Sequence, residues 1–159
     1  MKHLDTYKQK VLNTELLEYS AKKSSLQTIR ELISKGADVN CKSHTGETPL
    51  MKASKVMFYN AVKLFIENGA DVNAVTLSNH NALIRLAASI PVYSFDKKQS
   101  PKKIVDLLVT SGIDLTVKDK INNIDAFELN PAIGEYVMSK FPKECEEYIM
   151  KKDSEKYNI

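Results

Sequence analysis

A five-residue string occurs twice in this chain at a fixed distance. Gly36-Ala37-Asp38-Val39-Asn40 returns unchanged 33 residues later at 69–73, and a degraded copy, Gly112-Ile113-Asp114-Leu115-Thr116, follows after a further 43 residues. Self-similarity with a period of 20–50 residues is the sequence signature of stacked supersecondary units. The repeat therefore predicts a solenoid, in which each unit contacts mainly its neighbours.

Each copy of the string follows an apolar pattern with helical spacing. The pattern consists of Ile29, Leu32 and Ile33, then of Val62, Leu64, Phe65 and Ile66, then of Ile104, Val105, Leu107 and Leu108. Such a stripe is typical of a helix packed on one side. The glycine after it suits the left-handed residue that ends many helices.

A second, shorter helix is predicted about twelve residues after the first glycine. Thr48 can cap this helix and Pro49 can occupy its first position, where the missing N–H costs nothing. Asn81 is the matching cap in the next copy, and the last copy reads Ile124-Asp125-Ala126 at this position. Each unit is therefore predicted to be a turn, a short helix, a second helix and a glycine stop.

These motifs resemble the ankyrin-repeat family, most closely in the 33-residue period, in Gly-Ala-Asp-Val-Asn and in Gly46-Glu47-Thr48-Pro49-Leu50. The resemblance implies an all-α solenoid whose units are joined by β-hairpin-like loops. One departure is the histidine that commonly follows Thr-Pro-Leu and ties neighbouring loops together. Met51, Ile84 and Phe127 replace it here, so we expect the loops to be less regularly braced.

We expect one domain over residues 1–159 with four repeats and a cap at each end. The predicted segments are an N-terminal cap helix at 1–13, repeats at 14–40, 41–73, 74–116 and 117–141, and a C-terminal capping helix with a fraying tail at 142–159. Degraded first and last copies fit the polar outer faces that the terminal units of a solenoid need.

The third repeat carries ten additional residues between its two helices, near 90–101. A tolerated surface insertion is one interpretation, because lengthening a loop costs little free energy. A binding loop that presents Tyr93 and Phe95 is another, since aromatic residues on loops often anchor partners. In a third, the rings fold back over the edge of the stack. We favour the first and third interpretations together.

Bulk composition argues against several functions. A net charge of +3, spread along the chain and mixed with acidic residues, does not indicate a nucleic-acid partner. No apolar run of transmembrane length or signal-peptide stretch occurs, so we expect no membrane association and a cytoplasmic location. Secretion as an effector stays open. Cys41 and Cys145 are expected to be free thiols, and the protein to be a monomer when free.

The sequence predicts no enzyme, metal or cofactor. It contains no Gly-rich phosphate loop and no catalytic His or Ser motif. Cys145 lies among glutamates, which raise a thiol pKa and make a poor nucleophile. His44 and His80, with Cys41, are the one tempting zinc set; we prefer the alternative of two solvated loop histidines.

The resemblance implies that hairpin tips and the exposed side of each first helix hold a partner. Carried over by register, these residues are Ser43, His44, Thr45, Glu47 and Lys55, then Thr76, Leu77, Ser78 and His80, then Asp119, Lys120 and Ile121. Leu77 and Ile121 are apolar where loops are usually polar, so they are predicted to form an exposed patch.

The predicted function is therefore a non-catalytic module that recognises one partner protein. An inhibitor or immunity protein is the leading role. The alternatives are a host-directed effector or adaptor, and an assembly factor in a larger complex.

Overall fold

The computed structural model describes residues 2–95 and 99–157, with the side chains of 5–156 apart from those of residues 93 and 96–99. Its helices form four successive pairs, as expected for an all-α solenoid. The pairs are α1 (Lys2–Tyr19) with α2 (Leu26–Ser34), α3 (Pro49–Lys55) with α4 (Tyr59–Glu67), α5 (Ala82–Ala87) with α6 (Gln99–Thr110), and α7 (Ala126–Leu129) with α8 (Pro131–Lys140). A 3-10 turn, η1 (Val92–Ser94), interrupts the third pair, and α9 (Glu146–Tyr157) follows the fourth.

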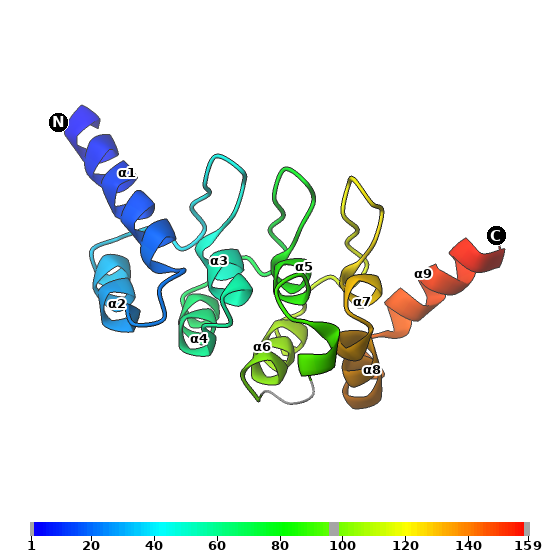
Figure 1. The fold of residues 1–159 in the computed structure, drawn as a ribbon. Coiled ribbons are helices and arrows are strands. Elements are labelled where there is room, and N and C mark those ends of the chain that lie inside the picture. The colour runs from blue at the N-terminus through cyan, green and yellow to red at the C-terminus, as the bar shows by residue number, and fades with distance from the viewer. Residues whose placement is uncertain (1, 96–98, 158–159) are drawn as a thin grey trace.

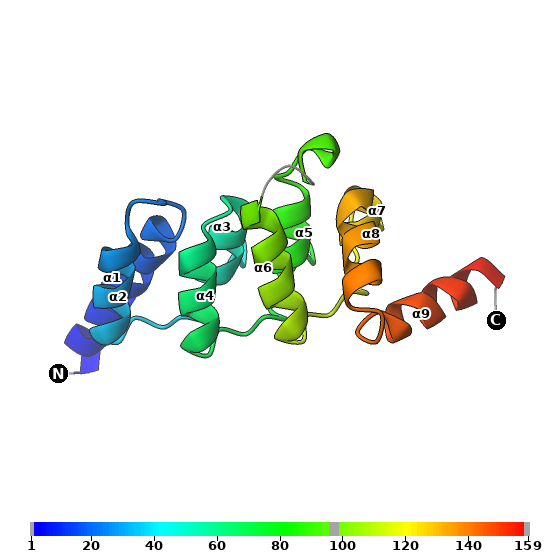
Figure 2. The same ribbon diagram turned by 90° about the horizontal axis from the view of Figure 1, so that it is seen from below.

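Stacking of equivalent helices generates an elongated molecule. Helix α3 packs on α5 and α5 packs on α7, while α4 packs on α6. Figure 1 shows the loops that precede α3, α5 and α7 extending in the same direction from this row. Seen from below, the helix pairs follow one another from the N-terminal to the C-terminal end (Figure 2).

The short helices begin where capping residues satisfy their free N–H groups. Thr48 Oγ1 accepts a hydrogen bond from the N–H of Met51 at 3.3 Å, and Asn81 Oδ1 accepts one from Ile84 at 3.0 Å. Asp125 Oδ1 accepts bonds from Phe127 and Glu128, both at 2.9 Å. An N-cap of this kind contributes about 1 kcal/mol. The caps predicted at Thr48 and Asn81 are confirmed.

The repeated glycine ends the longer helices in the left-handed conformation. Gly69 has φ 80°, and the next residue, Ala70, donates its N–H to the carbonyl of Phe65 at 3.0 Å. Gly36 and Gly112 have the same backbone geometry. A side chain at this position would be strained, which is why the repeat keeps glycine.

The repeated asparagine connects each turn to the following one. Asn40 Oδ1 accepts the N–H of Asp71 at 2.7 Å, and its Nδ2 donates to the carbonyl of Gly69 at 3.0 Å. Asn73 makes the same two bonds to Asp114 and Gly112, at 2.7 and 3.0 Å. We call this two-bond contact the asparagine clasp. It fixes the distance and the orientation between consecutive units.

The N-terminal end differs from the predicted division at residues 13 and 14. The cap and the first repeat helix are one continuous helix, α1. Its side chains replace the clasp of a preceding repeat: Gln9 Nε2 donates to the carbonyl of Gly36, and Asn13 Oδ1 accepts the N–H of Asp38, both at 2.9 Å. Gln9 and Asn13 are four residues apart, so a continuous helix places both side chains on the same face.

Apolar side chains from both helix rows form one continuous core along the stack. Leu50 and Leu83 are 1% and 0% exposed, and Phe65 and Ile104 are fully buried. Within the described part of the chain, no helix has the length and apolar character needed to span a membrane.

Truncation of the stacking leucines tests the repeat register. We expect Leu50→Ala and Leu83→Ala each to lower the free energy of unfolding by about 2–5 kcal/mol, since each leaves a cavity between units. The exposed Lys63→Ala on α4 should change it by less than about 0.5 kcal/mol. Urea denaturation measures all three, and midpoints unchanged in both leucine variants would contradict the register.

Candidate binding face

Three loops, at residues 42–47, 75–80 and 119–124, form what we call the hairpin tips. The first residue of each turn organises it: Ser43 Oγ accepts the N–H of Glu47 at 3.1 Å, Thr76 Oγ1 that of His80 at 3.1 Å, and Asp119 Oδ1 that of Ile121 at 2.7 Å. Short oxygen-bearing side chains stabilise turns in this way. The tips are therefore locally ordered by their own sequence.

Backbone hydrogen bonds also join each tip to its neighbour. Leu77 donates its N–H to the carbonyl of Thr45, and Lys120 donates to that of Ser78, each at 3.1 Å. Gly46 lies at the first junction with φ 81°, and a Cβ there would come within 3.1 Å of the backbone of Thr76 and Leu77. The expectation of poorly braced loops was wrong, because the backbone supplies the bracing that the missing histidines do not.

Two aliphatic side chains are highly exposed on the tips. Leu77 is 70% exposed and Ile121 is 80% exposed, and His44 is also exposed. Leu77 and Ile121 are not at equivalent positions of their tips, however. The third tip is one residue longer, since Asp119 pairs with the carbonyl of Ile124 whereas Thr76 pairs with that of His80. Lys120, and not Ile121, is consequently the equivalent of Leu77.

Four of the predicted contact residues serve the fold instead. Thr76 and Asp119 are buried, because each faces the turn that it organises. His80 Nε2 bonds to Asp119 Oδ2 of the next tip, so His80 does not face His44. Bonds from the Asn122 N–H and from His80 lower the pKa of Asp119. The fourth residue is Glu47, whose carboxylate pairs with cations of α3 and α5.

Glu47 connects the first tip to the short helices α3 and α5. Its carboxylate contacts Arg85 of α5 and lies 3.9 Å from Lys52 Nζ of α3. Lys52 and Arg85, which are 33 residues apart and thus at equivalent positions of neighbouring repeats, therefore share one carboxylate. Lys55 lies one turn beyond Lys52 on the same side of α3 and is exposed, as predicted.

The insertion in the third repeat folds back onto the stack. Phe95 is fully buried and packs edge-to-face on Tyr136 of α8, with ring centroids 5.6 Å apart. Asn130 Nδ2 donates to the carbonyl of Ile90 at 2.9 Å, which anchors the start of the segment. The prediction of Phe95 as an exposed anchor was wrong, and the folded-back interpretation holds for it. The side chain of Tyr93 lies outside the described residues.

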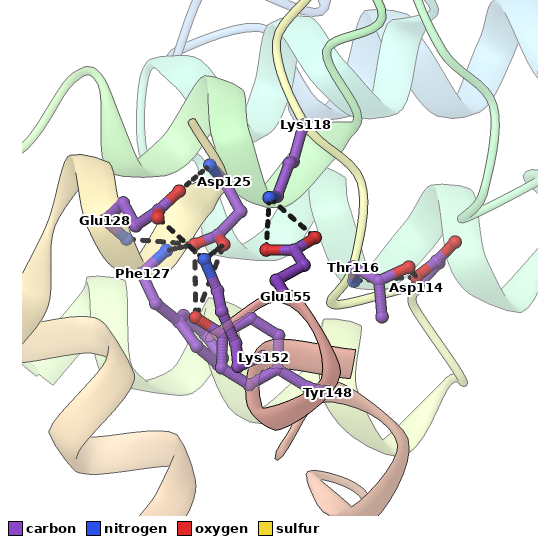
Figure 3. Close-up of polar contacts among 9 residues, drawn as sticks. All are labelled: Asp114, Thr116, Lys118, Asp125, Phe127, Glu128, Tyr148, Lys152 and Glu155. Atoms are coloured by element: carbon purple, nitrogen blue, oxygen red, sulfur yellow. Dashed lines mark hydrogen bonds and ion pairs between the residues drawn. The ribbon is translucent and has the colours of Figure 1, made fainter. Parts of the chain in front are cut away.

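A polar cluster at the C-terminal end was not predicted as a unit. Asp125, fully buried, accepts a hydrogen bond from the hydroxyl of Tyr148 at 3.3 Å and lies 2.9 Å from Lys152 Nζ. Lys152 also contacts Glu128 at 2.6 Å (Figure 3). Nearby, Lys118 Nζ lies 2.8 Å from Glu155. These contacts hold α9 against the cap of α7. An Asp cap followed by Glu three residues later was the available signal for part of it.

Charge and burial shift the pKa values in this cluster. Burial and the charge of Asp125 raise the pKa of Tyr148 to about 12. For Lys152, the cost of burial is outweighed by hydrogen bonds to Glu128 and Asp125, which raise its pKa. Burial opposes ionisation of Glu128, but Lys152 and the Asp125 N–H prevail and lower its pKa. The cluster thus favours protonated Tyr148 and Lys152 together with ionised Glu128.

The described residues offer little for catalysis. Both cysteines are free and buried. Burial and the nearby Asp38 raise the pKa of Cys41 to about 12, and burial followed by Glu144 raises that of Cys145. A thiol with a raised pKa is a weak nucleophile. Across the residues that the structure describes, no three His, Cys, Asp or Glu side chains gather as a metal site would require.

Replacing Phe95 separates a packing role from a binding role for the insertion. Phe95→Ala should lower the free energy of unfolding by about 3–5 kcal/mol, the usual cost of deleting a buried ring. Val92→Ala, at a position 47% exposed in the same segment, should cost less than about 0.5 kcal/mol. Thermal and urea denaturation report both, and equal stabilities would contradict the buried position of the ring.

The C-terminal cluster predicts a specific pH dependence. Tyr148 has a folded-state pKa near 12 against 10 for the ordinary side chain, so its stabilising contribution is complete below pH 10 and is lost as pH rises through 12. Tyr148→Phe should remove this loss, which amounts to no more than about 2.7 kcal/mol because one pKa unit corresponds to about 1.36 kcal/mol. Tyrosinate absorbance during alkaline titration measures it. A wild-type titration with no late-ionising tyrosine would contradict the cluster geometry.

Comparison with known proteins identifies the repeats. A family model described as ankyrin repeats (3 copies) matches residues 17–119. The ankyrin repeat protein FPV243 of fowlpox virus (strain NVSL) is 44% identical over 57 residues, which is 36% of this chain and 22% of that protein. FPV031 of the same virus is 29% identical over 122 residues, 76% of this chain and 32% of that protein.

A similarity outside viruses is also found. The Caenorhabditis elegans ankyrin repeat and KH domain-containing protein mask-1 is 30% identical over 122 residues, 76% of this chain and 4% of that protein. The chain spans between 22% and 39% of the length of the fowlpox virus proteins that it matches. Because the family model covers more than half of the sequence, the chain belongs to the ankyrin-repeat family.

Proposed function

We propose that this chain binds a single partner protein through the hairpin tips and the adjoining side of α3 and α5, which together we call the hairpin face. Ankyrin repeats are in general protein-interaction modules. The observation that carries the proposal for this chain is the exposure of Leu77 and Ile121, at 70% and 80%, on tips that are bonded to one another. Apolar side chains that are exposed close together, with polar residues around them, are typical of protein-interaction sites.

The rigidity of the face supports recognition. Side-chain oxygens order each turn, backbone bonds join neighbouring tips, and the asparagine clasp fixes the units beneath them. Binding to an ordered surface loses little conformational entropy, so more of the contact energy appears as affinity. Neither cysteine is an activated nucleophile, because burial raises the pKa of Cys41 and of Cys145.

Among the roles considered, the comparisons favour a host-directed adaptor or effector over an immunity protein. Three of the relatives are ankyrin repeat proteins of a virus, and viral proteins act among the proteins of a host cell. In this proposal the chain is a monomer when free and meets its partner in the cytoplasm. An assembly factor would instead recover several subunits together.

Charge placed on the exposed tip residues tests the proposal. A variant with His44→Glu, Leu77→Glu and Ile121→Glu should lose its partner while remaining folded, because all three side chains are exposed and the new charges would have to be desolvated on binding. Capture from host-cell extract with wild type and variant, followed by mass spectrometry, identifies the protein that disappears. A loss of affinity of about 100-fold or more is expected, equivalent to about 2.7 kcal/mol.

A matched control comes from the opposite side of the solenoid. Met138 on α8 is an apolar side chain that is 40% exposed. Met138→Glu should keep the partner at wild-type affinity, and circular dichroism should show all variants folded. If the tip variant is folded and still binds the same protein, the partner site lies elsewhere on the chain.

A further inference from the structure

The carboxylates on the hairpin face are already used by the protein itself. Glu47 is 15% exposed at its side chain and contacts both Arg85 and Lys52. Asp119 is 6% exposed and accepts hydrogen bonds from two backbone N–H groups of its own turn and a contact from His80. Neither carboxylate is therefore available to pair with a basic group of a partner.

Several cations on the same face have no carboxylate partner within the described part of the chain. Lys42 begins the first tip and lines an open groove of about 580 Å³ between this tip and α1. Lys55 is exposed on α3. Lys120 is exposed on the third tip, where its Nζ donates to the carbonyl of Leu77 at 3.1 Å. Five cations, namely Lys42, Lys52, Lys55, Arg85 and Lys120, thus share this face with the carboxylates of Glu47 and Asp119.

The second helices of the four pairs, α2, α4, α6 and α8, are here called the outer helices. Two lysines on them do have a carboxylate partner. Lys63 lies 3.7 Å from Glu67 within α4, and Lys140 of α8 lies 2.7 Å from Asp106 of α6. Both of these lysines are paired with a carboxylate, whereas, among the described residues, Lys42, Lys55 and Lys120 on the hairpin face are not. An uncompensated charge on one face attracts a partner of the opposite sign and accelerates its association.

The neighbouring apolar groups indicate what kind of anion would bind. Leu77 and Ile121 are large aliphatic side chains exposed on the same tips as these lysines or on a neighbouring tip. Single-stranded nucleic acids are usually held by aromatic rings on which bases stack, and the three tips contain no Phe, Tyr or Trp. Aliphatic side chains between lysines are instead complementary to a polypeptide that carries both carboxylates and apolar residues.

We propose that the partner presents to the hairpin face an acidic segment in which Asp or Glu alternates with aliphatic or aromatic residues. This inference rests on the proposed function and adds the chemistry of the partner. Carboxylates of the segment pair with Lys42, Lys55 and Lys120. Its apolar side chains cover Leu77 and Ile121, and the spacing of the tips sets an extended arrangement along the row.

The proposal can be tested before the natural partner is known, with a random-peptide display library selected on the immobilised full-length chain. The selected peptides should be enriched in Asp and Glu together with apolar residues. Synthetic versions should bind Lys42→Glu/Lys55→Glu/Lys120→Glu at least about tenfold more weakly, equivalent to about 1.4 kcal/mol. The control Lys35→Glu/Lys63→Glu/Lys103→Glu carries the same charge change on exposed residues of the outer helices and should bind within about twofold of wild type.

The outcomes separate this inference from the proposed function. Neutral or basic peptides that lose affinity for Leu77→Glu/Ile121→Glu would overturn the acidic partner but leave the hairpin face as the binding site. Selected peptides that bind the lysine variant and Leu77→Glu/Ile121→Glu as tightly as wild type would overturn both the acidic partner and the proposed binding face. The same conclusion would follow if selection on wild type enriched no peptide relative to selection on the lysine variant. A mixed-sequence single-stranded oligonucleotide that binds wild type and is lost in the lysine variant would also overturn the proposal, in favour of nucleic acid.

Discussion

The asparagine clasp is the contact on which the rest of this structure depends. Asn40 and Asn73 each bond both a backbone donor and a backbone acceptor of the following turn. Two hydrogen bonds from one planar amide fix orientation as well as distance, which a single bond does not. Because each unit is placed in this way, the tips arrive close enough for Leu77 to reach the Thr45 carbonyl and for Lys120 to reach that of Ser78.

The two ends of the array replace a missing neighbour by different means. At the start, Gln9 and Asn13 of α1 divide the work of one clasp between two side chains. At the end, Thr116 stands where the repeat has asparagine, and α9 is held instead by Asp125, Tyr148 and Lys152. The buried carboxylate of Asp125 is tolerated there because two backbone N–H groups and a hydroxyl donate hydrogen bonds to it and an ammonium group compensates its charge.

The hairpin face, which we propose as the binding site, is ordered, but two of its large apolar side chains are exposed. Its polar groups mostly bond within the protein, as Glu47 does with Arg85 and Lys52. The aliphatic side chains of Leu77 and Ile121 remain exposed beside Lys120. The insertion does not compete for this role through Phe95, because that ring fills a space between the third and fourth units and contacts Tyr136. This is why the proposed binding site is on the tips rather than on the irregular loop.

The repeat, the capping residues Thr48 and Asn81 and the glycine stops could be predicted from the sequence, because each depends on residues close in the chain or on a fixed period. Which tip residues are exposed could not be predicted in this way, because their exposure depends on contacts within and between the folded loops. Thr76 and Asp119 turned inward to order their own loops, and one added residue shifted Ile121 out of register with Leu77. The tertiary structure also decided the positions of Phe95 and of the Asp125 cluster. These depend on contacts between segments 23 to 43 residues apart, for which local pattern carries no signal.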